Sequence, residues 1–458
     1  MTRSALLLLG LLLLVPARAQ DAPPPTPAGD ELEELRAAAF APEVLRARRL
    51  ALLAALPAGA VVIVAAPAHV DDTWPYRPSP DFLWLTGVRE PGYTLLLAEG
   101  IDLLLAPRKD TNHELWNGPR LAPGAEDTGF QAVVDRAELP RRLSALLPTA
   151  EKLWLSGVEL PALELPGAEG GATPPGPGAQ GTPPSGDPRE QLHALRQVKD
   201  GGELALLQRA IDITGAGLVE AMRSAAPGRV EYELQAVIEY LFLRHGAQRP
   251  GFASIVGSGP NSCVLHYQSN RRRTAAGDLV VMDVGAELWG YTADVTRTVP
   301  VGGKFTPRQR EIYELVLRAQ EEGFKAVRPG ATIRQVDAAA RRVIREAGHA
   351  GRFPHGTSHW LGMDVHDVGA YSRPFEPGMV LTVEPGVYLA EEGIGVRIED
   401  DVLVTEDGYR VLSAGIPRTV EALEALLARR DGVGARDAAP VPAREPAPRR
   451  ERSRRREF

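Results

Sequence analysis

Residues 279–299, LVVMDVGAELWGYTADVTRTV, decide the fold of the second half of this chain. Two β-branched runs flank a Gly-containing break, which predicts an antiparallel hairpin with its turn centred between Leu288 and Trp289. Asp283 and Asp294 are equally far from that centre, so they are predicted to face each other. Because facing residues lie about 4.5–5.5 Å apart at Cβ, two such carboxylates repel each other unless cations lie between them.

Residues 379–404, MVLTVEPGVYLAEEGIGVRIEDDVLV, repeat this arrangement. A turn between Glu391 and Glu392 places Glu384 opposite Glu399 across a second hairpin. For either acid pair alone, a solvated or salt-bridged strand surface is the more common explanation. Two hairpins that each pair acids, with histidines nearby in the sequence, favour a metal centre.

Three histidines lie within FPHGTSHWLGMDVHDVG, residues 353–369. His355 and His359 are four residues apart, as in the zinc-binding H-E-x-x-H helix. Gly356 replaces the glutamate of that motif, and Gly, Thr and Ser are poor helix formers, so the zincin interpretation is rejected. A lone histidine is more often packed or exposed than a ligand, but these two and His366 accompany paired acids.

Five side chains are the candidate metal ligands, and four carboxylates with one imidazole suit a pair of hard divalent ions. They are Asp283, Asp294, His359, Glu384 and Glu399. This donor set favours manganese, with cobalt or zinc as alternatives, over a thiolate-type zinc site.

Five motifs closely resemble those of the pita-bread metallopeptidases, specifically the Xaa-Pro aminopeptidase (aminopeptidase P) family. They are LHYQSN at 265–270, VMDVGAELWGYTADVTRT at 281–298, HGTSHWLGMDVHDVG at 355–369, LTVEPGVY at 381–388 and GVRIEDDVLV at 395–404. Upstream, WPYRPSPDFLWLTGVREP at 74–91 and ELWNGPRL at 114–121 resemble the amino-terminal domain of these enzymes, which methionine aminopeptidases lack. The resemblance implies an α/β (α+β) protein: a pita-bread catalytic domain preceded by a creatinase/aminopeptidase P-like α/β domain.

The resemblance also implies a role for each ligand. Asp283 would bind one metal ion and Asp294 both, His359 would complete one coordination sphere, and Glu384 and Glu399 would hold the rest. It also points to manganese. Creatinase shares the fold without using the metals, and non-peptidase relatives have lost ligands, so the intact set favours a working metal centre over a pseudoenzyme.

A mechanism follows as a hypothesis. Two ions about 3.5–4 Å apart can share a water and lower its pKa, leaving hydroxide to attack the scissile carbonyl, while Glu384 takes the proton. By resemblance, His266 and His366 would stabilise the tetrahedral intermediate and bind the substrate near its Xaa-Pro bond. His355 would also line the substrate pocket.

Arg397 lies two residues before Glu399, on the same strand face, and is expected to brace the site acids. Tyr388 is expected to join it, and the alternative for Arg397 is an ordinary surface ion pair. Cys263, the single cysteine, is assigned no chemistry. By resemblance, Trp116 would cover the active site of a neighbouring subunit in a dimer or tetramer; a local core anchor is the alternative.

The substrate expected is a peptide with proline at its second position, from which the first residue is released. Prolidase, a dipeptidase, uses the same metals and is the alternative activity. Two further alternatives are a non-catalytic exported binding protein of this fold and creatinase-like amidine hydrolysis, which would need no metal.

A length of 458 residues and a hydrophobic content of 44% allow two domains with appendages. The predicted organisation is a signal peptide at 1–19, a Pro-rich segment at 20–30, an amino-terminal domain at 31–165, a Gly/Pro-rich insertion at 166–188, a catalytic domain at 189–430 and a disordered Arg/Pro-rich tail at 431–458. Amphipathic helical patterns precede both hairpins, in keeping with two related halves.

The amino terminus has the layout of an export signal: Arg3, an apolar run over 5–15 and an Ala-x-Ala ending at Ala19. At about 11 residues the run is short for a membrane span, which needs about 20, and an uncleaved anchor is the alternative. Export to a periplasm or the medium is therefore expected. A net charge of −7 argues against nucleic-acid binding.

Overall fold

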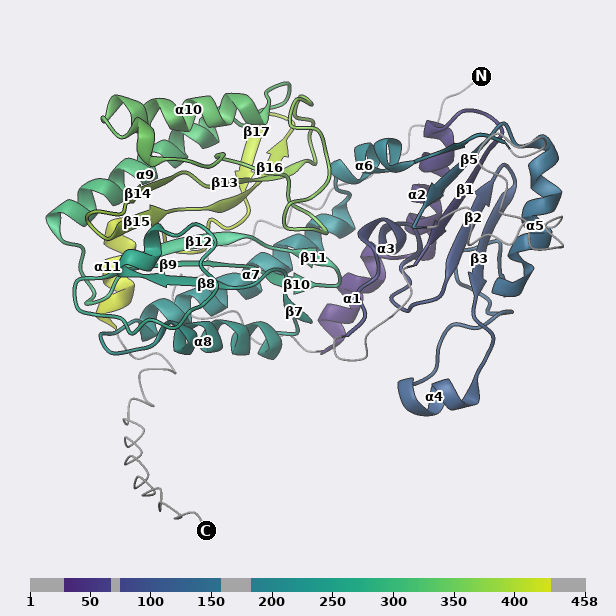
Figure 1. The fold of residues 1–458 in the computed structure, drawn as a ribbon, viewed down its shortest axis with the longest axis horizontal. Coiled ribbons are helices and arrows are strands. Elements are labelled where there is room, and N and C mark those ends of the chain that lie inside the picture. The colour runs from purple at the N-terminus through teal and green to yellow at the C-terminus, as the bar shows by residue number, and fades with distance from the viewer. Residues whose placement is uncertain (1–28, 67–74, 158–182, 430–458) are drawn as a thin grey trace, which may run out of the picture.

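The computed structural model describes residues 29–66, 75–157 and 183–429 (Figure 1). The predicted export signal, the tail from 431 and most of the segments at 20–30 and 166–188 lie outside the described residues. The described end of the predicted insertion is paired, since Ser185 and Gly186 form a short strand parallel to Leu153 and Trp154. No helix of the described part is long and apolar enough to cross a bilayer.

The amino-terminal part is built on one mixed six-stranded sheet. Its order is β4-β3-β2-β1-β5-β6, with β1 at Ala60–Ala65, β2 at Thr94–Ala98, β3 at Ile101–Ala106, β4 at Ala132–Asp135, β5 at Lys152–Ser156 and β6 at Ser185–Gly186. The β1–β2 and β2–β3 pairs are antiparallel, whereas the other three pairs are parallel. The amino-terminal part is thus an α/β unit, as the resemblance implies.

Helices accompany this sheet and connect it to the rest of the chain. They are α1 at Gly29–Ala39, α2 at Pro42–Ala55, α3 at Pro80–Thr86, α4 at Thr111–Asn117, α5 at Leu139–Leu146 and α6 at Arg189–Gln197. The short α4 stands away from the sheet at the end of a long excursion (Figure 1). By contrast, α1 packs on α7, at Gly201–Ser224, in the carboxy-terminal part.

The carboxy-terminal part places its strands between two pairs of long helices (Figure 1). The helices are α7 at Gly201–Ser224, α8 at Glu231–Arg244, α9 at Pro307–Ala326, α10 at Ile333–Glu346 and, near the end, α11 at Val420–Ala428. Reciprocal capping boxes begin α7, between Asp200 and Glu203, and α9, between Thr306 and Gln309. This arrangement is the predicted pita-bread fold, in which each helix pair precedes its own hairpin.

The strands between these helices form several small antiparallel sheets. They are β7 at Arg249–Pro250, β8 at Ile255–Ser258, β9 at Leu279–Val284, β10 at Ala286–Leu288, β11 at Tyr291–Thr292, β12 at Val295–Pro300, β13 at Val380–Val383, β14 at Gly386–Leu389, β15 at Ile394–Arg397, β16 at Asp400–Thr405 and β17 at Gly408–Val411. The metal-centre acids lie on or directly beside β9, β12, β13 and β16.

The register of the first hairpin differs from the prediction. Asp283 pairs with Thr296, not with Asp294. The turn residues are Trp289 and Gly290, with φ of 52° and 92°, so the two-residue turn is centred one position later than expected. This moves the pairing by two residues, which retains the side of the sheet because side chains alternate with a period of two.

The register of the second hairpin is confirmed. Val383 pairs with Asp400, and Gly386 pairs with Arg397. These pairs flank Glu384 and Glu399 and share the predicted centre between Glu391 and Glu392.

Buried charges join the two parts of the molecule close to the third histidine of the 353–369 segment. Arg196 of α6 donates hydrogen bonds to Asp81 of α3 and to Asp367, the latter at 2.7 Å. Lys199 lies 3.2 Å from the other oxygen of Asp367. Because Asp367 follows His366 directly, the segment carrying that histidine is anchored from both parts.

Candidate metal centre and substrate cavity

A cavity of about 710 Å³ contains all five candidate metal ligands. Its wall also includes His266, His355, His366 and Arg397, together with apolar side chains. The apolar lining consists of Phe252, Ile255, Leu265, Ile333 and Val365. Acids, imidazoles and apolar surface therefore meet in one cavity large enough for a short peptide.

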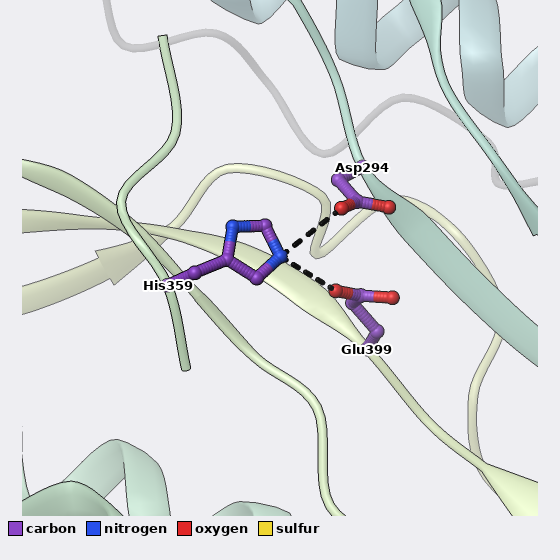
Figure 2. Close-up of side chains that lie close together, drawn as sticks. All are labelled: Asp294, His359 and Glu399. Atoms are coloured by element: carbon purple, nitrogen blue, oxygen red, sulfur yellow. Dashed lines mark ion pairs between the residues drawn. The ribbon is translucent and has the colours of Figure 1, made fainter. Parts of the chain in front are cut away.

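Three of the ligands form a tight buried group (Figure 2). Ligand atoms of Asp294, His359 and Glu399 all lie within 4.8 Å of one another. The Nε2 atom of His359 is 3.3 Å from Asp294 Oδ2 and 3.9 Å from Glu399 Oε1. Its Nδ1 atom lies 3.0 Å from the carbonyl oxygen of Trp360, which orients the ring with Nε2 toward the acids.

Glu384 and Asp283 complete the cluster from neighbouring strands. Glu384 Oε1 is 3.6 Å from His359 Nε2, and the Glu384 amide donates to the carbonyl oxygen of Thr357 at 2.8 Å. Asp283 Oδ2 accepts a 2.6 Å hydrogen bond from Arg397, so one of its oxygens stays on the cluster side. Side chains distant in the sequence thus converge on one point.

Three buried carboxylate oxygens of this cluster have no hydrogen-bond partner in the described part of the chain. They are Asp283 Oδ1, Asp294 Oδ1 and Glu399 Oε1. An unsatisfied buried polar atom is costly, and three converging carboxylate oxygens would be stabilised by a cation. The donor set and its orphan oxygens therefore fit hard divalent metal ions.

Burial and mutual repulsion raise the pKa values of three of the acids. Burial first, and then the nearby carboxylates, raise the pKa of Asp294 and of Glu399 well above their ordinary values. Burial also raises the pKa of Glu384 to about 7, although His359 and Arg397 oppose the shift. Without cations, burial and mutual repulsion thus favour protonation of Asp294 and Glu399, and Glu384 titrates near neutral pH.

Arg397 lies at the centre of a buried hydrogen-bond network, which rules out a surface ion pair. Its guanidinium donates to Asp283, to Thr296 Oγ1 at 3.1 Å and to the Tyr388 hydroxyl at 3.1 Å. The same hydroxyl lies 2.8 Å from His355 Nε2. Burial, and then the charge of Arg397, lower the pKa of His355 to about 4, so this imidazole is neutral near pH 7.

Of the remaining residues singled out from the sequence, two histidines line the cavity, whereas Trp116 and Cys263 do not. The His366 ring is 4.3 Å from the His359 ring, edge to face, and burial lowers its pKa. His266 is exposed on the cavity wall. Trp116, on α4, is 78% exposed and does not line this cavity, which excludes a local core anchor. Cys263 is half-buried and does not line it either.

Two residues that the sequence analysis missed support the ligands. Thr296 donates a 2.6 Å hydrogen bond to Glu399 Oε2, and the buried Asp401 accepts the backbone N–H of Asp294 at 3.2 Å. Thr296 could have been found from the correct hairpin register, because it is the cross-strand partner of Asp283. Asp401 carries no sequence signal beyond its place after Glu399.

Comparisons with known proteins agree with this geometry. Residues 205–406 match metallopeptidase family M24, and residues 45–154 match the aminopeptidase P amino-terminal domain. The Xaa-Pro aminopeptidase of Escherichia coli is 38% identical over 431 residues, covering 83% of this chain and 96% of that protein. That of Haemophilus influenzae is 38% identical over 392 residues, covering 78% and 90%.

Solved structures give the same result. Aminopeptidase P from E. coli with the inhibitor Pro-Leu has a TM-score of 0.77 at 34% identity, covering 85% of this chain and 99% of that chain. The Pseudomonas aeruginosa aminopeptidase has a TM-score of 0.76 at 32% identity, covering 85% and 98%. Fold and site together define a metallopeptidase with two structural parts. The chain belongs to the aminopeptidase P family.

Proposed function

We propose that this protein is an exported, dinuclear metal-dependent aminopeptidase that releases the first residue from peptides with proline in second position. The observation that carries the proposal is the buried cluster of four acids and His359 with its orphan oxygens, in a cavity of peptide size. Its relatives over most of the chain are Xaa-Pro aminopeptidases. Manganese is the proposed metal, with cobalt or zinc as alternatives.

The metal would be held by Asp283, Asp294, His359, Glu384 and Glu399. Divalent ions bound there supply Lewis-acid chemistry, which polarises a carbonyl and makes water acidic enough to react near neutral pH. Asp283 is oriented by Arg397, Glu399 by Thr296 and His359 by the Trp360 carbonyl, so three of the five ligands have a fixed direction before any ion binds.

The chain's own residues supply the remaining steps. Glu384 accepts a proton from the attacking water and delivers it to the proline nitrogen as the amide bond breaks. His366 and His266 donate hydrogen bonds to the scissile carbonyl oxygen, where negative charge develops. His355, kept neutral by burial and fixed by Tyr388, lines the substrate side of the cavity.

The proposed activity is tested by metal analysis and by hydrolysis of Ala-Pro-Ala and of the dipeptide Ala-Pro. We expect about two equivalents of metal per chain and release of alanine from the tripeptide. The Glu384→Gln variant should reduce kcat by about 100-fold or more. Turnover after complete metal removal, or unchanged activity of Glu384→Gln, would contradict the proposal.

Dipeptidase activity is the competing function. The Xaa-Pro dipeptidase of Pyrococcus furiosus is 39% identical to this chain, but over only 48% of it. The aminopeptidase relatives also cover the amino-terminal part, which supports the aminopeptidase. Activity confined to Ala-Pro would favour the dipeptidase instead.

Assembly and export complete the proposal. Leu115 and Trp116 are about four-fifths exposed on α4, at 80% and 78%, and such neighbouring apolar side chains suit contact with a second copy of the chain. We expect a dimer or tetramer, which sedimentation showing a fully active monomer would contradict. Export predicts cleavage after Ala19, which amino-terminal sequencing of the mature protein checks.

A further inference from the structure

Arg334 is a charged residue of the substrate cavity that the proposed mechanism does not use. It lies in the first turn of α10 and lines the same cavity as the metal ligands. Its side chain is exposed, and within the described part of the chain it makes no hydrogen bond or ion pair. A guanidinium on a cavity wall without an acid partner is available to a ligand.

The neighbouring acid on α10 is already occupied. Asp337, three residues after Arg334, is at the spacing at which helical side chains pair. Its Oδ1 atom accepts hydrogen bonds from the Thr357 N–H at 3.1 Å and hydroxyl at 2.8 Å. Its Oδ2 atom accepts from Arg341 at 2.7 Å. Asp337 is therefore held toward the 353–357 segment, and Arg334 keeps its charge available.

The other arginine of the cavity is engaged and buried. Arg397 binds Asp283 at 2.6 Å and is 3% exposed. The acids of the cavity wall other than Asp337 are the four carboxylates of the metal centre. Arg334 is thus the lining arginine that can meet a negative charge on a substrate.

We infer that Arg334 makes the enzyme prefer peptides that carry a carboxylate after the proline. The inference rests on the proposed function. In such a peptide the residue before the scissile bond bears the free ammonium, which a guanidinium repels. The carboxylates of the remaining chain lie on the other side of the scissile bond from this ammonium. The source is either the terminal carboxylate of a short peptide or an acidic side chain.

Two peptide pairs distinguish these sources with the metal-loaded enzyme. Ala-Pro-Ala and its amide report the terminal carboxylate; Ala-Pro-Asp amide and Ala-Pro-Asn amide report the side chain. For at least one pair, we expect the charged member to have a higher kcat/KM by about two- to fivefold, mainly through KM. About 1 M salt should reduce this preference, because the Debye length falls to about 3 Å.

Arg334→Gln should abolish the preference while the neutral amides are cleaved as by wild type, and Arg334→Lys should retain part of it. Arg345→Gln is the matched control, because Arg345 is exposed on the same helix but does not line this cavity. Equal kcat/KM within both pairs, or a preference that survives Arg334→Gln, would overturn the inference alone. Failure of the wild type to cleave any of the four peptides would overturn the proposed function with it.

Discussion

Thr296 is the residue through which the metal centre and its supporting network meet. Its hydroxyl donates to Glu399 and accepts from Arg397, which in turn holds Asp283. Residues that orient ligands in this way set both the geometry and the basicity of a metal site. The role of such a threonine is not predictable from the residue type alone, because it depends on which side chains lie across the sheet.

Thr296→Val removes this hydroxyl at nearly constant volume. We expect metal affinity to fall by about 10- to 100-fold, because Glu399 loses its orienting donor. Thr298→Val is the control: Thr298 is also buried and hydrogen-bonds the Arg397 backbone, but it does not contact a ligand. Competitive chelator titration measures both variants. A similar loss of affinity in Thr298→Val would show that only general stability had changed.

Arg397→Met tests the buried ion pair. Removing one partner of such a pair leaves an uncompensated charge, so the metal-free protein should lose about 3–5 kcal/mol of unfolding free energy in urea. The metal-loaded protein should lose less, because bound cations compensate Asp283. The control is Arg308→Met, which breaks an exposed pair with Glu392 and should cost much less, because solvent screens exposed charges. Equal costs for the two variants would contradict this.

At the scale of elements, the two hairpins mark how far sequence reasoning reaches. The long helices and strands were predicted because their apolar periodicity is strong, and the second hairpin kept its register around the Glu-Glu turn. The predicted register of the first hairpin is wrong because Trp289 adopts a left-handed conformation that is uncommon for a bulky residue. The five ligands still converge, since a two-residue shift leaves side chains on the same face.

The side-chain partners that the sequence does not predict are set by contacts between elements that are distant in the chain. Asp337 and Arg341 of α10 form hydrogen bonds with the backbone of the 353–357 segment and with each other. Because Asp337 is engaged in this way, it does not pair with Arg334. No sequence motif marks these contacts, because the apolar periodicity of a helix predicts which face is buried and not which residues contact its polar side chains. The exposure of Trp116 likewise depends on the position of α4, away from the sheet.

Gly290→Ala tests the turn of the first hairpin. Gly290 has φ of 92°, and an added Cβ would lie 2.7 Å from a methyl of Leu83. We expect a loss of about 1–2 kcal/mol from backbone strain, plus a further loss from the contact. Gly228→Ala is the control, since its φ of 90° is similar but nothing lies within 4 Å. If urea unfolding shows equal losses of unfolding free energy for the two variants, the contact with Leu83 adds no cost.

At the scale of the whole molecule, metal binding and stability are linked through the buried acids. In the unfolded chain these carboxyls have pKa values near 4, whereas burial raises that of Glu384 to about 7 and raises those of Asp294 and Glu399 well above their ordinary values. The metal-free folded state therefore binds protons more tightly than the unfolded state. The contribution of these three acids to its stability is present in full below their unfolded pKa values and is lost as pH rises through their folded pKa values.

We therefore expect the melting temperature of the chelator-treated protein to fall between pH 5 and pH 8, while the metal-loaded protein changes little. Against the opposing effect of burial, His193 and then Arg196 lower the pKa of Asp81, and Lys199 and then Arg196 lower that of Asp367. These two acids therefore lose their contribution only below this range. Thermal unfolding at each pH, with and without manganese, measures the difference. Parallel curves for the two forms would contradict the linkage.

The charges shared between the two parts of the molecule limit how the chain can be recombined. Glu203 of α7 is 2% exposed and accepts from Trp84 at 3.0 Å, and Arg196 depends on Asp81. A chimera that joined residues 189–429 to a foreign amino-terminal half would leave both charges buried without these partners. Such a graft would also lack Arg48, which lies 3.6 Å from Glu203, so the donor half would have to bring an arginine, a tryptophan and an aspartate to the same places.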